Sequence, residues 1–217
     1  DPRPDPRDPT EPADPEPAPP KVAKLPVPTM PEQKPIQTKI AQVFELDALK
    51  TGEEKIAAAK RMYEVGREPS ENHTERYVML ATAARMAAGA GDLGTALKSV
   101  DEIDKSFNSK TAAMQLYLVR EFADARIPKP LKEQQLNYVV PVLDRGLAND
   151  EFEAVDKTVT ELFSSGLSHK TLGERRRIAR EMKSKYRVVA AAKEQLKTNP
   201  DDGAANKLVG EYICFQK

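Results

Sequence analysis

Residues 85–97 read RMAAGAGDLGTAL, and this stretch decides the fold class of the chain. Gly89 and Gly91 end one apolar pattern, because glycine is the residue that most often follows the last turn of a helix. Asp92 comes next, and its short acceptor side chain is typical of a helix N-cap. Apolar residues then return with the 3.6-residue period of a helix, at Leu93, Ala96, Leu97, Val100, Ile103 and Phe107. The stretch therefore predicts a short turn between two amphipathic helices.

Helices of the same kind are predicted before this turn, from Ile36 onward. Thr51 and Glu54 have the spacing of a capping box, which predicts a helix from there to about Gly66. The next helix is the one that ends in the turn. Its apolar face is predicted to consist of Tyr77, Leu80, Ala81, Ala84 and Ala87.

The pattern continues after the turn. Asn108 and Ser109 are predicted to start a fourth helix, because such residues favour helix starts. Its inward-facing residues are predicted to be Ala113, Leu116, Phe122 and Ala123. Pro128 and Pro130 form the clearest internal break and indicate a turn between helices. The fifth helix that follows contains Pro141, which should kink it or mark its true start.

Two further helices have recognisable starts. Asn149 and Asp150 are predicted to cap a sixth helix. A long seventh helix is predicted over about 168–197, opened by the capping-box spacing of Thr171 and Glu174.

An eighth helix is predicted to start in the stretch Asn-Pro-Asp-Asp at residues 199–202 and to reach the chain end. No stretch alternates apolar and polar residues with the period of a half-buried strand. The fold class predicted for residues 36–217 is therefore all-α, a single domain of about eight helices. Because no later helix covers the eighth, we expect the chain to be truncated there, with an exposed helix face through which it could self-associate.

Residues 1–35 hold 13 of the 18 prolines, most of them interleaved with charged residues. Such a segment buries too little apolar surface to offset its ordering entropy, so it is predicted to be a disordered proline-rich linker. A semi-rigid spacer is the favoured interpretation of this leader, and a docking site for a proline-reading domain is the alternative. Residues 21–35 are less polar and are expected to lie along the folded domain.

Composition limits the classes of partner. The chain has 34 basic and 34 acidic residues, so binding to nucleic acid or to an acidic membrane would require a local patch. No apolar run approaches the roughly 20 residues that cross a bilayer.

The one cysteine, Cys214, forms no internal disulfide and is predicted to be a small apolar core residue. The chain begins with Asp1 instead of Met, so we expect it to be part of a longer protein, with any targeting segment outside it.

Two helix pairs resemble one another, since the turn at residues 145–155 repeats the small-residue turn at 85–97. Residues 196–210, LKTNPDDGAANKLVG, begin what resembles a third unit. The sequence NPDDGAANKLVG at residues 199–210 resembles the first-helix opening of a tetratricopeptide repeat, and G-D-x-x-x-A-L resembles its second helix. Most aromatic consensus positions are missing and the spacing differs from the consensus. The resemblance implies antiparallel helix pairs stacked as a short, degenerate tetratricopeptide-like α-solenoid.

A narrower resemblance rests on the order of five short motifs: K-I-x-x-x-F, E-R-Y-x-x-L, A-G-D-L, N-P-D-D and Y-I-C-F. This order is similar to uncharacterised helical domains of large planctomycete proteins, which tend to sit beside a proline-rich linker and a membrane anchor. The resemblance implies a bacterial cell-envelope location, favoured over the cytoplasm, with the anchor outside this chain. It implies no activity and no site residues.

The sequence motifs for catalysis and cofactor binding give little support to an enzyme. Residues 89–94, GAGDLG, match the dinucleotide-binding pattern, but a helix precedes them where that motif requires a strand. His73 and His169 have no second ligand at metal-binding spacing, so we expect no zinc site. Carboxylates are spread along helix faces beside lysines and arginines, which is typical of solvated pairs. The sequence therefore predicts that the chain is not an enzyme and that it binds no cofactor and no metal.

One basic stripe is a candidate binding surface. Arg176, Arg180, Lys183 and Arg187 fall on one face of the predicted seventh helix, a possible contact for phosphates or an acidic protein surface. An ordinary solvated face is the favoured alternative, and no stacking aromatic residues interleave the stripe.

Three hypotheses about function remain at this point. The favoured one is a non-catalytic protein–protein interaction or spacer module of a larger protein, with an unidentified protein partner. The alternative is a nucleic-acid-associated or regulatory helical protein that uses the basic stripe of the 169–197 helix. The third, an enzyme with helical carboxylate chemistry, would need converging acidic residues that the inward apolar faces do not supply.

Overall fold

The structure is a computed structural model that describes residues 23–215. This part of the chain contains ten α-helices and one turn of 3-10 helix, which confirms the all-α fold class. The elements are α1 (Met30–Val43), η1 (Leu46–Ala48), α2 (Gly52–Arg67), α3 (His73–Ala90), α4 (Leu93–Ser106), α5 (Thr111–Asp124), α6 (Lys129–Gln134), α7 (Leu136–Ala148), α8 (Phe152–Ser164), α9 (Lys170–Thr198) and α10 (Gly203–Phe215). Helices α1 and α6 are additional to the eight that were predicted.

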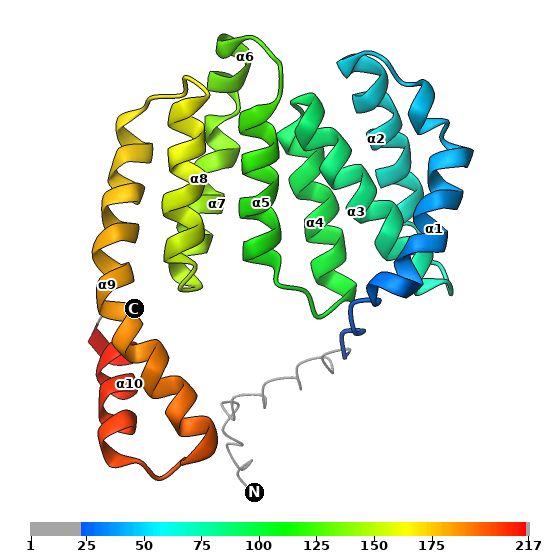
Figure 1. The fold of residues 1–217 in the computed structure, drawn as a ribbon. Helices are drawn as coiled ribbons and strands as arrows, with labels where there is room; N and C mark the ends of the chain where they lie inside the picture. Colours follow the sequence, from blue (N-terminus) through cyan, green and yellow to red (C-terminus); the bar gives the residue numbers. More distant parts are fainter. Residues whose placement is uncertain (1–22, 216–217) are drawn as a thin grey trace, which may run out of the picture.

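The helices stand side by side and form two rows (Figure 1). In one row α1 contacts α3, α3 contacts α5, and α5 contacts α8. In the other, α2 contacts α4 and α7 contacts α9. Each of the pairs α2–α3, α3–α4 and α8–α9 joins one row to the other, and α10 packs against α9. Apolar faces are therefore buried between the rows.

The turn at residues 85–97 has the predicted structure. Gly91 has a left-handed φ of 94°, and a Cβ atom there would lie 2.8 Å from the side chain of Ile127. Glycine is therefore required at this position by both backbone conformation and packing. Asp92 caps α4, since its side chain accepts a hydrogen bond from the Thr95 amide at 3.0 Å.

Buried side chains form two clusters. The larger includes Leu93, Leu116, Val119, Leu143 and Leu162, which come from α4, α5, α7 and α8. The smaller lies at the N-terminal end of the rows and includes Ile40, Met62, Leu80, Ile103 and Phe107. Together the two clusters fix α1 and α5 on either side of α3.

The chain is ordered well before the predicted domain boundary at residue 36. The Leu25 amide donates to the Ser106 carbonyl, and the Asn108 amide donates to the Leu25 carbonyl, both at 2.8 Å. Helix α1 then begins at Met30, where Thr29 and Glu32 form a capping box. The boundary predicted after Pro35 therefore falls inside a helix, and the expectation that residues 21–35 lie along the domain is met from residue 23 on. The rest of the predicted leader, residues 1–22, lies outside the described residues.

Three predicted helix starts are wrong in detail. Helix α5 begins at Thr111, two residues later than Ser109. The N-cap of α8 is Glu151, which makes no side-chain cap hydrogen bond. Asp150 has a left-handed φ of 64°, and its carboxylate contacts Tyr212 and Lys193. Helix α9 is capped by His169, because the ring Nδ1 accepts a hydrogen bond from the Thr171 amide at 3.3 Å.

The prediction that Cys214 is a core residue is also wrong, because the thiol is exposed. Helix α10 buries Ala205 and Tyr212. Cys214 follows Tyr212 by two residues, about 200° around the helix, and so lies on the opposite face. Ile178 of α9 is likewise exposed, at 37 %.

Candidate docking groove

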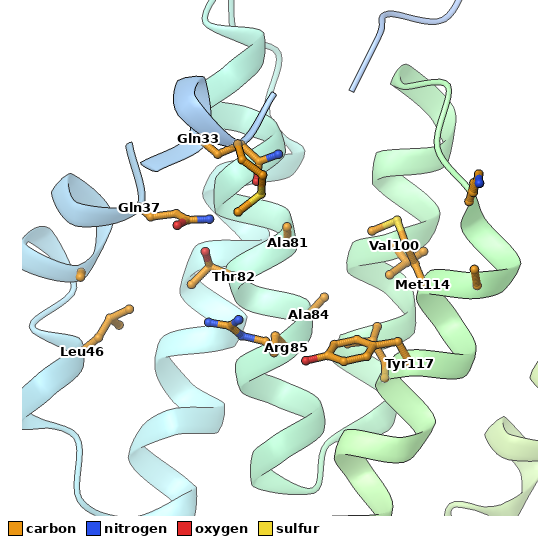
Figure 2. A pocket seen from close by; sticks show the side chains of 15 residues that line it. Gln33, Gln37, Leu46, Ala81, Thr82, Ala84, Arg85, Val100, Met114 and Tyr117 are labelled. Atoms are coloured by element: carbon orange, nitrogen blue, oxygen red, sulfur yellow. The ribbon is translucent and has the colours of Figure 1, made fainter. Parts of the chain in front are cut away.

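A groove opens in the row of helices α1, α3 and α5, with a volume of about 680 Å³ (Figure 2). That volume lies within the roughly 300–1,000 Å³ of ordinary ligand pockets. The lining residues are Met30, Gln33, Gln37, Ala41, Leu46, Ala81, Thr82, Ala84, Arg85, Val100, Lys110, Ala113, Met114, Tyr117 and Leu118.

Small residues of α3 form the floor of the groove. Ala84 is 2 % exposed, and Ala81 is partly buried beside it. Both were predicted on the inward face of this helix, together with Leu80. Because α3 lies between α1 and α5 in the row, short side chains on its outer surface leave a channel between the two flanking helices. The alanines of α3 were therefore the only sequence signal for the groove. Alanine occurs both in tight core contacts and in the floor of a channel, so this signal does not distinguish the two.

Polar side chains line the α1 wall. Gln33 and Gln37 lie one helical turn apart, and Figure 2 shows both side chains directed from α1 toward the groove. One N–H of the Gln33 amide donates to the Pro28 carbonyl at 2.6 Å. The carbonyl oxygen of Gln33 and the amide of Gln37 make no hydrogen bond within the part of the chain that the structure describes. Thr82 adds a hydroxyl group from the floor.

The only charged residues that line the groove within the described part of the chain are two cations, Arg85 and Lys110. Neither of them forms an ion pair with another of the described residues, and no aspartate or glutamate is among the lining residues. In a chain with equal numbers of acidic and basic residues, this groove is therefore locally positive.

Tyr117 and Met114 form the apolar wall on the α5 side, and Met30 adds an apolar side chain from the start of α1. The hydroxyl of Tyr117 is hydrogen-bonded to Glu121 at the rim, which together with partial burial raises the pKa of the phenol, while nearby Arg85 opposes the rise. Met30 is 69 % exposed, and Met114 packs partly against the core. Methionine side chains adapt to irregular partners, so this wall can accommodate different apolar groups. Altogether, the groove offers apolar contact, hydrogen bonds and positive charge.

The predicted basic stripe lies elsewhere, along α9 where it faces α8. Arg176 and Arg180 donate from their Nε atoms to one oxygen of Asp156, at 3.0 and 2.9 Å. Lys183 lies 3.4 Å from a carboxylate oxygen of Glu153. Arg187 is exposed, and the described residues offer it no ion pair.

Asp156 is the centre of this α8–α9 seam. Burial alone would raise the pKa of Asp156, but hydrogen bonds from Arg176 and Arg180 outweigh it and lower the pKa below its ordinary value. Arg176 also lies over the ring of Phe163, with 5.6 Å between the guanidinium carbon and the ring centroid. The preceding residue, Arg175, makes a bidentate contact with Asp144 of α7 at 2.8 and 3.0 Å. Three of the four stripe residues, Arg176, Arg180 and Lys183, therefore join α9 to α8.

Sequence reasoning missed a polar cluster that attaches α10. The Tyr212 hydroxyl donates to one oxygen of Asp150 at 2.6 Å, and Lys193 lies 3.3 Å from the other. The Lys193 ammonium also lies over the rings of Tyr186 and Tyr212, at 4.9 and 5.5 Å. Burial and the hydrogen bond to Asp150 raise the pKa of Tyr212 well above its usual range. Four residues from three segments meet here, and no sequence motif links them.

The other candidate residues remain apart. His73 is the exposed first residue of α3, and His169 is the exposed cap of α9. Within residues 23–215 there is no group of three histidine, cysteine, aspartate or glutamate side chains that could hold a metal ion. None of the described helices combines the length and the apolar character that a membrane span needs.

Comparison with protein-family models, with curated proteins and with solved structures found no match to this chain. The functional interpretation therefore rests on its own residues.

Proposed function

We propose that this protein is a non-catalytic protein–protein interaction module of a larger protein, arranged as a short tetratricopeptide-like α-solenoid. In this proposal the groove of α1, α3 and α5 binds the partner. The proline-rich leader holds the module away from a neighbouring domain, and the cell envelope is the proposed location.

The observation that carries the proposal is the groove itself. Apolar side chains that are left exposed on a folded domain, framed by polar groups, are typical of interaction sites. The two-row packing supports the solenoid, because helices that contact mainly their neighbours leave one row free to present an extended surface.

The nucleic-acid alternative has less support. Three of the four residues of the basic stripe pair with carboxylates of α8. An arginine that is already paired gains less from a phosphate, because binding must first break the existing ion pair.

Site-specific photo-crosslinking tests the proposal. A benzoylphenylalanine placed at Ala113 on the groove wall is expected to capture one protein from source-cell lysate. The same group at Val65, an exposed residue of α2 outside the groove, serves as the control. The captured protein, once purified, should bind the chain with 1:1 stoichiometry.

Equal capture from both positions, or no capture from Ala113 in either soluble or membrane fractions, would contradict a docking role. Recovery of nucleic acid cross-linked through the 169–197 helix would favour the alternative.

A further inference from the structure

We infer that the groove of α1, α3 and α5 binds an extended, acidic peptide segment of the partner protein, through its main chain and its carboxylates. This inference rests on the proposed docking function and specifies the chemistry of the ligand. Three features of the groove carry it: the spacing of two glutamines, the sign of the charge and the shape of the floor.

The glutamine pair matches the repeat of an extended main chain. Gln33 and Gln37 are four residues apart on α1, so their side chains are offset by about 6 Å along the helix axis. An extended peptide presents its N–H and C=O groups to the same side every second residue, about 6.8 Å apart. A side-chain amide both donates and accepts, so each glutamine can pair with one residue of the peptide. A helical ligand would offer no such groups, because its main chain bonds to itself.

The length of the groove sets the length of the segment. Lining residues of α1 run from Met30 to Ala41, which corresponds to about 16 Å along the helix. At about 3.3 Å per residue, that distance holds about five residues of extended peptide.

The charge of the groove selects carboxylates. Arg85 comes from the middle of α3, and Lys110 comes from the residue before α5, two turns away from Tyr117. Neither cation forms an ion pair with another described residue, so both are available to a ligand, and Lys110 also borders a second pocket that Asp101, Asp104 and Glu151 line. A peptide with acidic side chains near both ends would meet both of them, whereas a basic peptide would be repelled.

Apolar side chains of the peptide would then face the floor. In an extended chain alternate side chains point to opposite sides. Those directed inward would lie on Ala81 and Ala84, beside Met114 and Tyr117, while the acidic ones remain near the solvent and the two cations. An alternation of acidic and apolar residues is therefore the sequence pattern expected of the ligand.

Fluorescence anisotropy with the full chain tests the inference. The probe is a labelled seven-residue peptide in which aspartate and leucine alternate, beginning and ending with aspartate. The first comparison probe has lysine in place of aspartate. The second keeps the sequence but carries N-methyl groups on the leucine amides, which removes main-chain donors. We expect the aspartate probe to bind at least about tenfold more tightly than either comparison probe.

Variants of the protein locate the binding site. The double variant Arg85→Glu, Lys110→Glu should weaken binding of the aspartate probe at least about tenfold, and Gln37→Leu about threefold to tenfold. Lys55→Glu, on the exposed surface of α2, and Gln42→Leu, on the outer side of α1, are matched controls that should leave binding unchanged. Circular dichroism of each variant would confirm that the helices remain folded.

Several outcomes would overturn the inference. Equal binding of the aspartate and lysine probes, or no effect of N-methylation, would show that the groove does not recognise an extended acidic chain. Binding that occurs only after residues 1–22 are deleted would identify the chain's own acidic leader as the occupant. If the peptides fail while the Ala113 crosslink still captures one protein, the docking function stands and this assignment of its ligand is wrong.

Discussion

The groove of α1, α3 and α5 and the seam between α8 and α9 are both rich in cations, yet the two regions use them differently. In the seam, Arg176 and Arg180 share the carboxylate of Asp156, and that pairing joins two helices. In the groove, Arg85 and Lys110 have no ion-pair partner within the described residues. The seam has the more regular sequence pattern, with cations one turn apart, whereas the groove residues come from separate helices.

The difference shows that the spacing of charges along one helix does not reveal their role. A stripe of arginines becomes structural when the neighbouring helix supplies carboxylates at the same height, as α8 does with Asp156 and Glu153. Isolated cations become available when their neighbours are alanine, methionine and glutamine. Availability for binding is therefore a property of the packed helices together, and the following experiments test it.

The largest expected effect is in the C-terminal region. Asp150→Ala removes the acceptor of the Tyr212 hydroxyl and the partner of Lys193, and places alanine at a left-handed φ. We expect a loss of about 2–4 kcal/mol in the free energy of unfolding, measured by urea denaturation. Asp150→Asn, which keeps an acceptor and tolerates this φ, should lose about half as much. A loss below about 0.5 kcal/mol for the alanine variant would show that the cluster does not hold α10.

The second experiment compares the two basic regions directly. Arg176→Glu brings a carboxylate next to Asp156 and should lower the free energy of unfolding by about 2 kcal/mol. Arg85→Glu makes the same change of charge in the groove, where no ion pair is lost, and should change it by less than about 0.5 kcal/mol. Thermal denaturation of both variants under one set of conditions provides the measurement. Similar losses for the two would mean that the groove cation is structural after all.

A smaller effect depends on pH. Because the pKa of Asp156 is lowered in the folded state, its ion pairs stabilise the protein above the ordinary value of 3.8. This contribution is lost as the pH falls through the lowered folded-state pKa. The difference in unfolding free energy between the native protein and Asp156→Asn should therefore be largest near neutral pH and shrink below about pH 4. A difference that stays constant from pH 7 to pH 3 would contradict the assignment.

The smallest effect concerns the outer face of α10. Because Cys214 is exposed, iodoacetamide should alkylate its thiol fully in the native protein, and the melting temperature should change by less than about 1 °C. Mass spectrometry after brief labelling measures the extent of reaction. Protection of the thiol until the protein unfolds would restore the prediction that Cys214 is a core residue.

Local signals in the sequence predicted much of the fold. The turn at Gly91 and Asp92 and the capping box at Thr51 depend on residues close together in the chain, and all three have the predicted role. Helix α1 was missed because Pro31 and Pro35 suggest an extended leader. Pro31 lies in the first turn, where proline is compatible with a helix, and the capping box at Thr29 starts the helix. Pro35 lies inside the helix, where sequence rules disfavour proline.

The candidate groove could not be predicted in the same way. Its walls and floor come from three helices whose order in space depends on packing between the rows. The same limit applies to Asp150, whose carboxylate contacts Tyr212, 62 residues later, instead of the helix next to it. Contacts at such separations depend on how the helices pack, and neither periodicity nor capping patterns contain that information.

The arrangement of the groove also has a consequence for biosynthesis. Its walls are synthesised in the order α1, α3, α5, so the site does not exist until residues near Leu118 have left the ribosome. The contacts of α1 with α3, and those of the segment around Leu25 with Ser106 and Asn108, involve residues that are synthesised before α5. A nascent chain that stalls before α5 would contain the α1 and α3 sides of the groove but not its α5 wall, and in the proposed function it could not yet recruit a partner. All groove residues are therefore synthesised before α7, α8, α9 and α10, which complete the larger buried cluster.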